Sequence, residues 1–452
     1  MYYSTQPGGP AIGVSLDNIR RTYNFGNSIA YLAAPESVFL STLMMGSKTV
    51  TDDPVFKHAE KRDQWHRQNF EVHANRGGTA IAANMQITGL QLTCHYDKFG
   101  RTLTDSNGDG IDTAPIFLVP DDVINVVGVI NGAKQMVQAR IVSVDSVQAA
   151  YVSVTVRIVA AGFTTDYATT FAGEELSFVD GDKGRSMGSV FAEGTGAPDG
   201  WTDEIYNREG YTQIFKTSVP VVTGTTLATR YRFAPGGNEW ARIWSPKMKE
   251  HKLGITRAML FNTGGLAPEG SATKRYTNGF IPYVWTYGVK HNFSYANTSY
   301  DDFMGFHEWF LDPERGGQNR KLIVCSRKIF TWANKLGDNG FLKNTLGGAA
   351  YNITVQNYRG VFGHQITHVW TPYGEVGFVI ENQLRGEWED YALVVDTGNV
   401  HYRPLSANGQ NRETQVKTNV QGNDVDGRKD MILTEAGLQI DLPETHAIWK
   451  FS

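Results

Sequence analysis

The stretch from residue 211 to residue 265 constrains the fold most strongly, because it joins extended segments to the most helical segment of the chain. The apolar stripe of the helical segment consists of Trp244, Met248, Ile255 and Met259, and charged residues fill the rest of its surface. Gly264-Gly265 predicts the end of the helix, since glycine is favoured just after a last helical turn. The pattern predicts a strand pair that is joined through Gly236-Gly237 to a helix with one buried face.

The start of this helix has two interpretations. Ser245-Pro246 has the chemistry of a helix start, because Ser can cap the first turn and Pro suits the first helical position. The alternative is a longer helix from Asn238, in which Pro246 would lie in the interior and cause a kink.

Composition excludes two classes of protein. Charged residues make up 19% of the 452 residues, hydrophobic residues 41%, and the net charge is -4. Such a chain is neither a polybasic nucleic-acid binder nor disordered. The 48 Gly, 20 Tyr and 23 Phe residues indicate many turns and a large share of β structure.

The two cysteines, Cys94 and Cys325, lie far apart, which argues against a disulfide framework or a cysteine zinc site and favours a reducing compartment. The first residues, MYYSTQPGGPAIGVS, lack the basic and apolar regions of a signal peptide, and we expect no cleaved leader. No apolar run approaches the length of a membrane helix, so no membrane partner is expected. The sequence predicts a cytosolic product.

A small antiparallel β-module is predicted at about residues 120–180. Residues 151–158 alternate between apolar and polar side chains, which is typical of a half-buried strand. Residues 126–130 and 135–137 flank Asn131-Gly132, the strongest short signal for a hairpin. A sandwich and a barrel are both compatible with this pattern.

Other elements are expected on both sides of this module. Short helices are predicted after Pro35, at about 300–311, and from a Ser326 cap to Gly337. Strands are predicted within 350–405 and 430–450. The charged run 58–63 (HAEKRD) suggests either a solvated stretch or a contact with another chain.

The sharpest local motif is the run 105–112, DSNGDGID. Asp105, Asn107 and Asp109 stand at positions 1, 3 and 5 of a calcium loop, and Gly110 stands at position 6. The bidentate acid of position 12 is missing, because that residue is Ile116. An exposed hairpin tip uses the same residue types and is the simpler interpretation.

No catalytic constellation is apparent. The sequence has no P-loop, nucleophile elbow, HExxH or dinucleotide-binding motif. Paired glycosidase carboxylates could come from Glu308, Glu381, Glu387, Glu389 and Asp390. Nothing selects two of them, so we expect neither an enzyme nor a cofactor.

Five blocks in order resemble the SU-ten-type major capsid proteins of tailed bacteriophages. They are 207–217 (NREGYTQIFKT), 219–225 (VPVVTGT), 238–242 (NEWAR), 248–251 (MKEH) and 256–261 (TRAMLF). Residues 277–281 (TNGFI), 29–39, 395–405 and 429–438 are similar to further blocks of the family. The resemblance covers most of the chain, although residues 90–200 match the family only loosely.

The resemblance implies an α+β, Hong Kong 97-like capsid fold. In this fold, 1–64 would be an N-terminal arm and 65–240 an extended loop that carries the inserted β-module. Residues 241–299 would hold the spine helix and peripheral domain, 300–405 the axial domain, and 406–452 the return to the peripheral domain.

The implied function is a major capsid protein that self-assembles into pentamers and hexamers of an icosahedral head around double-stranded DNA. Its expected place is the virion, after assembly in the host cytoplasm, with scaffold, cement and portal proteins as further partners. Inter-subunit ion pairs are expected at Lys216, Arg230, Arg232, Glu239 and Arg257. The alternatives are a tail or fibre subunit and a carbohydrate-active β protein.

Overall fold

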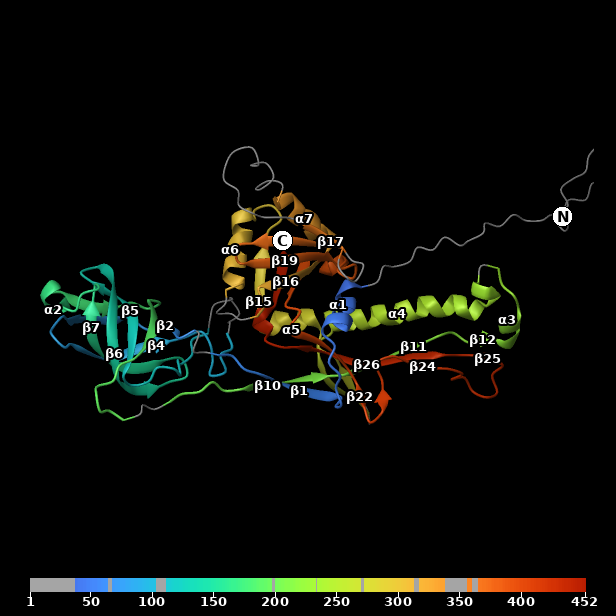
Figure 1. Cartoon of the computed structure of the whole chain (residues 1–452), viewed down its shortest axis with the longest axis horizontal. Helices are drawn as coiled ribbons and strands as arrows, with labels where there is room; N and C mark the ends of the chain where they lie inside the picture. The colour runs from blue at the N-terminus through green and yellow to red at the C-terminus, as the bar shows by residue number, and fades with distance from the viewer. Residues whose placement is uncertain are drawn as a thin grey trace, which may run out of the picture. The chain divides into compact units, whose positions relative to one another are not determined.

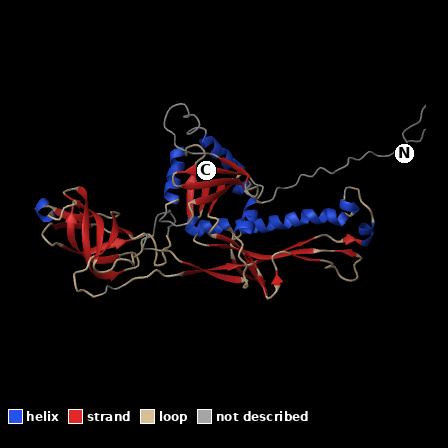
Figure 2. Ribbon diagram, viewed as in Figure 1, coloured by secondary structure: helices blue, strands red, loops and turns tan. Residues whose placement is uncertain are grey.

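The computed structural model describes residues 37–63, 67–102, 111–196, 200–232, 234–269, 272–312, 317–337, 356–359 and 365–452 (Figure 1). The chain divides into two parts, which are treated separately below. The described residues of Thr217–Glu250 and Val416–Ile432 form one part, here called the helix-start part. Residues 36–216, 251–415 and 433–452 form the main part. Helices and strands occur together, as the α+β prediction requires (Figure 2).

Six strands of the main part form a closed antiparallel barrel. Around the barrel they are β5 (Asp122–Ile130), β6 (Ala133–Val147), β7 (Val152–Ala161), β4 (Gln86–Thr93), β2 (Asn69–Val72) and β9 (Lys183–Ser189), which pairs again with β5. Two more strands, β8 (Glu175–Phe178) and β3 (Arg76–Ala80), extend the sheet from β5, and α2 spans Tyr167–Thr170. The barrel therefore takes in strands from Asn69 to Ser189, more than the expected 120–180.

The hairpin predicted at Asn131-Gly132 is confirmed. Asn131 and Gly132 connect β5 to β6 with φ angles of 50° and 72°. Both values are positive, as a type I′ turn requires. Side chains that alternate along these strands point inward, among them the fully buried Ile124 and Val126.

A two-stranded stem precedes and follows the barrel in the sequence. Strand β1 (Val55–Glu60) pairs antiparallel with β10 (Tyr206–Tyr211), so that Val55 lies opposite Tyr211 and Glu60 opposite Tyr206. Within the described residues no third strand joins this pair. Its outer edges carry backbone groups without a strand partner.

Two further cores lie on the two faces of a seven-stranded mixed sheet. Its order is β15 (Val289–Phe293), β27 (Ala447–Phe451), β20 (Tyr391–Val395), β16 (Arg320–Cys325), β19 (Gly374–Ile380), β18 (Gln365–Thr371) and β17 (Gln356–Arg359). Ile323 packs with α6 (Tyr300–Phe310) and α7 (Arg327–Gly337), whereas its neighbour Val324 packs with α1 (Val38–Gly46) and α5 (Phe280–Tyr287). Helices therefore cover both faces, as Figure 1 shows.

A second sheet is built on β26 (Met431–Ile440). Strand β21 (Val400–Pro404) pairs with it on one side, β11 (Gln213–Ser218) pairs on the other, and β24 (Gln415–Lys417) also joins it. The remaining strands are short pairs: β12 (Val222–Thr223) with β25 (Gly427–Arg428), β13 (Gly265–Glu269) with β14 (Ala272–Tyr276), and β22 (Ser406–Ala407) with β23 (Gln410–Asn411). Short helices are α3 (Gly224–Ala228), η2 (Pro235–Gly237), η5 (Gly386–Trp388) and η6 (Pro443–Thr445).

The long helix α4 spans Glu239–Phe261 and contains Pro246 in its interior. The helix start predicted at Ser245-Pro246 is therefore wrong, and the longer helix is the correct alternative. Asn238 supplies the cap, because its Oδ1 accepts a hydrogen bond of 3.0 Å from the backbone N–H of Trp240. The cap lies just after the left-handed Gly236 and Gly237, with φ angles of 62° and 79°.

The other predicted helices form where they were expected. Ser37 caps α1, Ser299 caps α6 with a full capping box, and the Ser326 hydroxyl accepts from the backbone N–H of Ile329 at 3.2 Å. Cys94 and Cys325 are both free and buried. None of the described helices combines the length and the apolar character that a bilayer crossing needs.

We predict that His307 makes the stability of the sheet and its helices pH-dependent. It is 1% exposed, its Nδ1 donates to the Phe303 carbonyl at 2.7 Å, and burial lowers its pKa to about 4. The unfolded chain takes up this proton near the ordinary pKa of about 6.5, so stability falls as the pH falls from about 6.5 to about 4. The full contribution is on the order of 3 kcal/mol.

Urea unfolding of the wild-type chain and of His307→Gln, at about pH 7 and at about pH 4.5, measures how much His307 contributes to the pH dependence of stability. We expect the variant to lose less stability between the two pH values than the wild type. An equal loss in both proteins would contradict the prediction.

Candidate assembly surface

The five residues expected at subunit contacts lie in or near the helix-start part. Lys216 is exposed on β11, and Arg230 and Arg232 are exposed between α3 and η2. Glu239 is the first residue of α4, and Arg257 is exposed near the end of that helix, in the main part. The cations Lys216, Arg230 and Arg232 are thus accessible to another molecule.

Some of these side chains already have partners within the chain. Glu239 forms an ion pair with Arg242 three residues later, and Arg257 donates from Nε to Gln383 Oε1 at 2.9 Å. Neither Lys216 nor Arg230 forms an ion pair with any residue that the structure describes. An inter-subunit carboxylate would meet least competition at these two cations.

A buried carboxylate anchors the helix-start part. Asp430 is fully buried and accepts from Arg428 Nη2 at 3.0 Å and from the backbone N–H of Asn419 at 3.1 Å. The guanidinium of Arg428 lies 4.0 Å from the ring centroid of Trp240. This contact stabilises the first turn of α4 by a cation–π interaction of about 0.5–2 kcal/mol.

Apolar side chains of the helix-start part are more often exposed than buried. Its buried apolar residues, within the described range, are Val219, Val222 and Ile432. The exposed large ones are Val221, Tyr231, Val416, Val420 and Val425. The indole N–H groups of Trp240 and Trp244 are also buried without a hydrogen-bond partner among the described residues.

The stem contains a buried network of charges. Glu60 Oε2 accepts from Arg62 Nη2 and from Arg208 Nε, each at 2.9 Å, and Arg62 also binds Glu444 Oε2 at 2.9 Å. Side-chain exposure is 0% for Glu60, 6% for Arg62 and 9% for Arg208. Burial opposes the charge of Arg62, but the carboxylates of Glu444 and Glu60 raise its pKa above the ordinary value.

Of the two alternatives for residues 58–63, this network shows that a solvated stretch is wrong for Glu60 and Arg62, whereas Ala59, Lys61 and Asp63 are exposed. The sequence of 58–63 shows only a dense run of charges, which exposed segments usually carry. Glu60 and Arg62 are both buried, Glu60 against the cations Arg62 and Arg208, and Arg62 against the carboxylates of Glu60 and Glu444.

Two of the five acids considered for glycosidase chemistry, Glu381 and Asp390, have structural partners. Glu381 Oε2 accepts from Ser37 Oγ at 2.8 Å and from the N–H of Phe39 at 3.0 Å, and thereby holds the start of α1. Asp390 Oδ1 accepts from Lys328 Nζ at 2.6 Å and from the Tyr295 hydroxyl at 2.8 Å, and these contacts hold its pKa below the ordinary value. The calcium candidates Asp105, Asn107 and Asp109 lie outside the described residues.

Comparison with known proteins gives one match over nearly the whole chain. The model of the family described as the SU10 major capsid protein matches residues 18–450. No curated protein matches significantly.

The solved structures that are similar to this chain have low sequence identity to it. One is from Microbacterium phage Oxtober96, with 10% identity, 96% of each chain covered and a TM-score of 0.41. Another is from Mycobacterium phage Bobi, with 8% identity, 96% of this chain and 97% of the other covered, and a TM-score of 0.41. A capsid structure of Cyanophage P-SCSP1u has 11% identity, with 58% of this chain and 80% of the other covered, and a TM-score of 0.35.

We predict that Arg208→Met destabilises the stem far more than Lys57→Met does. Removal of Arg208 leaves Glu60 with one of its two cations, and breaking a buried pair costs about 3–5 kcal/mol. Lys57 forms an exposed pair with Glu209 at 3.1 Å on the same two strands, and such a pair contributes about 1 kcal/mol or less.

Amide hydrogen exchange across residues 55–60 and urea unfolding measure the two variants. Faster exchange is expected in Arg208→Met alone. Similar exchange and similar unfolding midpoints for both variants would show that the network does not stabilise the stem.

Proposed function

Because the chain belongs to the SU10 major capsid protein family, and is therefore a major capsid protein of a phage virion, we propose that it assembles through pentamers and hexamers into an icosahedral head around double-stranded DNA. The family match carries the premise, since it covers residues 18–450. The predicted resemblance and the α+β, Hong Kong 97-like fold class are thereby confirmed. A tail or fibre subunit and a carbohydrate-active protein are no longer needed as alternatives.

Repeated contact between unlike surfaces of neighbouring subunits would build the rings. A contact of this kind closes into pentamers or hexamers when its rotation fits. The exposed apolar side chains of the helix-start part support this proposal, as do the free edges of the β1–β10 stem, because both are liabilities in a monomer.

We further propose a division of the chain into domains within the assembled head. Residues 1–64 are an N-terminal arm, and 65–240 are an extended loop with the barrel as its inserted module. Residues 241–299 belong to the spine and peripheral domain, with the observed α4 as the spine helix. Residues 300–405 form the axial domain around the seven-stranded sheet, and 406–452 return to the peripheral domain.

We propose that the chain acts by binding other subunits and not by catalysis. The glycosidase candidates Glu381 and Asp390 are occupied by internal donors, which supports this view. Packaged DNA would lie near the chain without specific recognition, consistent with a net charge of -4. Scaffold, cement and portal proteins remain proposed partners, and the host cytoplasm remains the proposed place of assembly.

Electron microscopy of the purified, expressed chain tests the proposal directly. We expect closed shells tens of nanometres across, built from rings of five and six subunits. A monodisperse monomer of 50.1 kDa under all assembly conditions would contradict it.

We predict that Arg230→Glu and Arg232→Glu each reduce shell formation strongly and leave the subunit folded. Both cations are exposed, so charge reversal acts on the neighbouring subunit more than on the core. Particle counts by electron microscopy and far-UV circular dichroism measure the two effects. Lys252→Glu, at an exposed cation of α4 in the main part, is the matched control.

Normal shells from both arginine variants would contradict the contact assignment. Equal loss in the Lys252→Glu control would show a general effect of charge and would also contradict it.

A further inference from the structure

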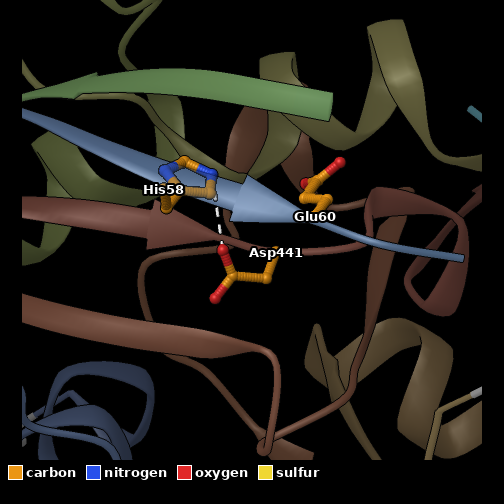
Figure 3. A group of neighbouring side chains, drawn as sticks. All are labelled: His58, Glu60 and Asp441. Atoms are coloured by element: carbon orange, nitrogen blue, oxygen red, sulfur yellow. Dashed lines mark ion pairs between the residues drawn. The ribbon is translucent and has the colours of Figure 1, made fainter. Parts of the chain in front are cut away.

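A histidine and two carboxylates converge at the base of the stem (Figure 3). His58 and Glu60 are two residues apart on β1 and therefore lie on one side of that strand. Asp441 follows β26 directly and approaches them from a distant segment of the chain. Among the residues that the structure describes, these three are the one such group whose ligand atoms all lie within 4.8 Å of one another.

His58 has only weak partners in this group. Its side chain is 7% exposed, and its contacts are the carboxylate of Asp441 and the backbone of Ile440, without a hydrogen bond of good geometry to a described residue. Nε2 nevertheless points at Asp441 and lies 3.3 Å from its Oδ1 (Figure 3). A bound cation would give this buried imidazole a full-strength partner.

We propose that His58, Glu60 and Asp441 bind one divalent transition-metal ion of the zinc class. Zinc binds imidazole nitrogen and carboxylate oxygen at about 2.0–2.2 Å, which places two tetrahedral ligands roughly 3.4 Å apart. The observed separation of 3.3 Å between Nε2 of His58 and Oδ1 of Asp441 fits this value. An imidazole ligand disfavours calcium and magnesium, which prefer oxygen.

The carboxylates are held in place for this role. Gln439 Nε2 donates to both oxygens of Asp441, at 2.9 and 2.8 Å. The two arginines bind Oε2 of Glu60, whereas Oε1 accepts only the backbone N–H of Leu442, at 3.0 Å, among the described donors. Oε1 therefore retains a lone pair for the ion.

Around the group, the carboxylates of Glu60, Asp441 and Glu444 are offset by the charges of Arg62, Arg208 and Arg403. Arg62 is shared with Glu444, so its charge is not directed at Glu60 alone. Burial lowers the pKa of His58, although Asp441 opposes this shift.

Two neighbouring sets of side chains are poorer candidates. His401 Nε2 contacts the other oxygen of Asp441, Oδ2, at 3.4 Å, and His401 does not belong to the compact group. In the barrel, His73 and His95 both contact Asp112, at 3.0 and 3.5 Å, but these side chains are more exposed. His95 is therefore a suitable control.

An ion at this position would tie β1 to the segment after β26, some 380 residues later in the sequence. The tie would hold the stem on the second sheet. This inference does not depend on shell formation, because the whole group comes from one chain.

Zinc binding to the full-length chain tests the proposal. Protein stripped with a chelator is titrated with zinc chloride by calorimetry, and bound metal is counted after gel filtration. We expect one tightly held ion per chain in the wild type and in His95→Gln. In His58→Gln and Asp441→Asn, affinity is expected to fall by about 100-fold or more, since losing a residue that only orients a ligand already costs about 10–100-fold.

Circular dichroism verifies that each variant is folded, and Asp441→Asn replaces His58→Gln if the latter does not fold. Absence of a stoichiometric ion in the wild type overturns the proposal. Undiminished binding in a folded His58→Gln or Asp441→Asn, or loss of binding in His95→Gln, also overturns it.

Discussion

Burial of both faces of the seven-stranded sheet is the constraint on which the main part depends. Along each central strand, neighbouring apolar residues point to opposite sides: Ile323 and Phe378 face α6 and α7, whereas Val324 and Val379 face α1 and α5. A strand shifted by one residue would exchange these two sets, and both cores would be lost. The alternation therefore fixes the register of the sheet and, with it, the helices that cover each face.

Several buried charges of the main part are paired. Lys321 Nζ lies 2.7 Å from Asp396, and Glu435 accepts from Arg275 and Arg412 at 2.8 and 2.6 Å. Glu60 follows the same rule in the stem. Such pairs add little net stability compared with apolar residues, but losing one partner is costly. They therefore specify which distant segments meet, as Glu60 does for Arg208.

The helix-start part follows a different principle. It has few buried apolar side chains, exposes others, and holds the cap of α4 through the contact of Arg428 with Trp240. Surfaces of this kind gain their stability from a neighbour. A subunit that is well packed in one part and incomplete in another suits a protein whose function is to join copies of itself.

The sequence by itself determined the local elements and the family. The Asn131-Gly132 turn, the Ser326 cap and the blocks of 207–281 act over a few residues, so their patterns could be read directly. Tertiary structure alone decided which strands close the barrel, because β2 and β9 pair across more than a hundred residues. It also decided that Glu60 and Arg62 are buried and that His58 faces Asp441, since no local pattern shows which distant charge will neutralise or approach a side chain. The start of α4 lies between these cases: Asn238 and Ser245 are both adequate caps, and only the folded chain selects Asn238.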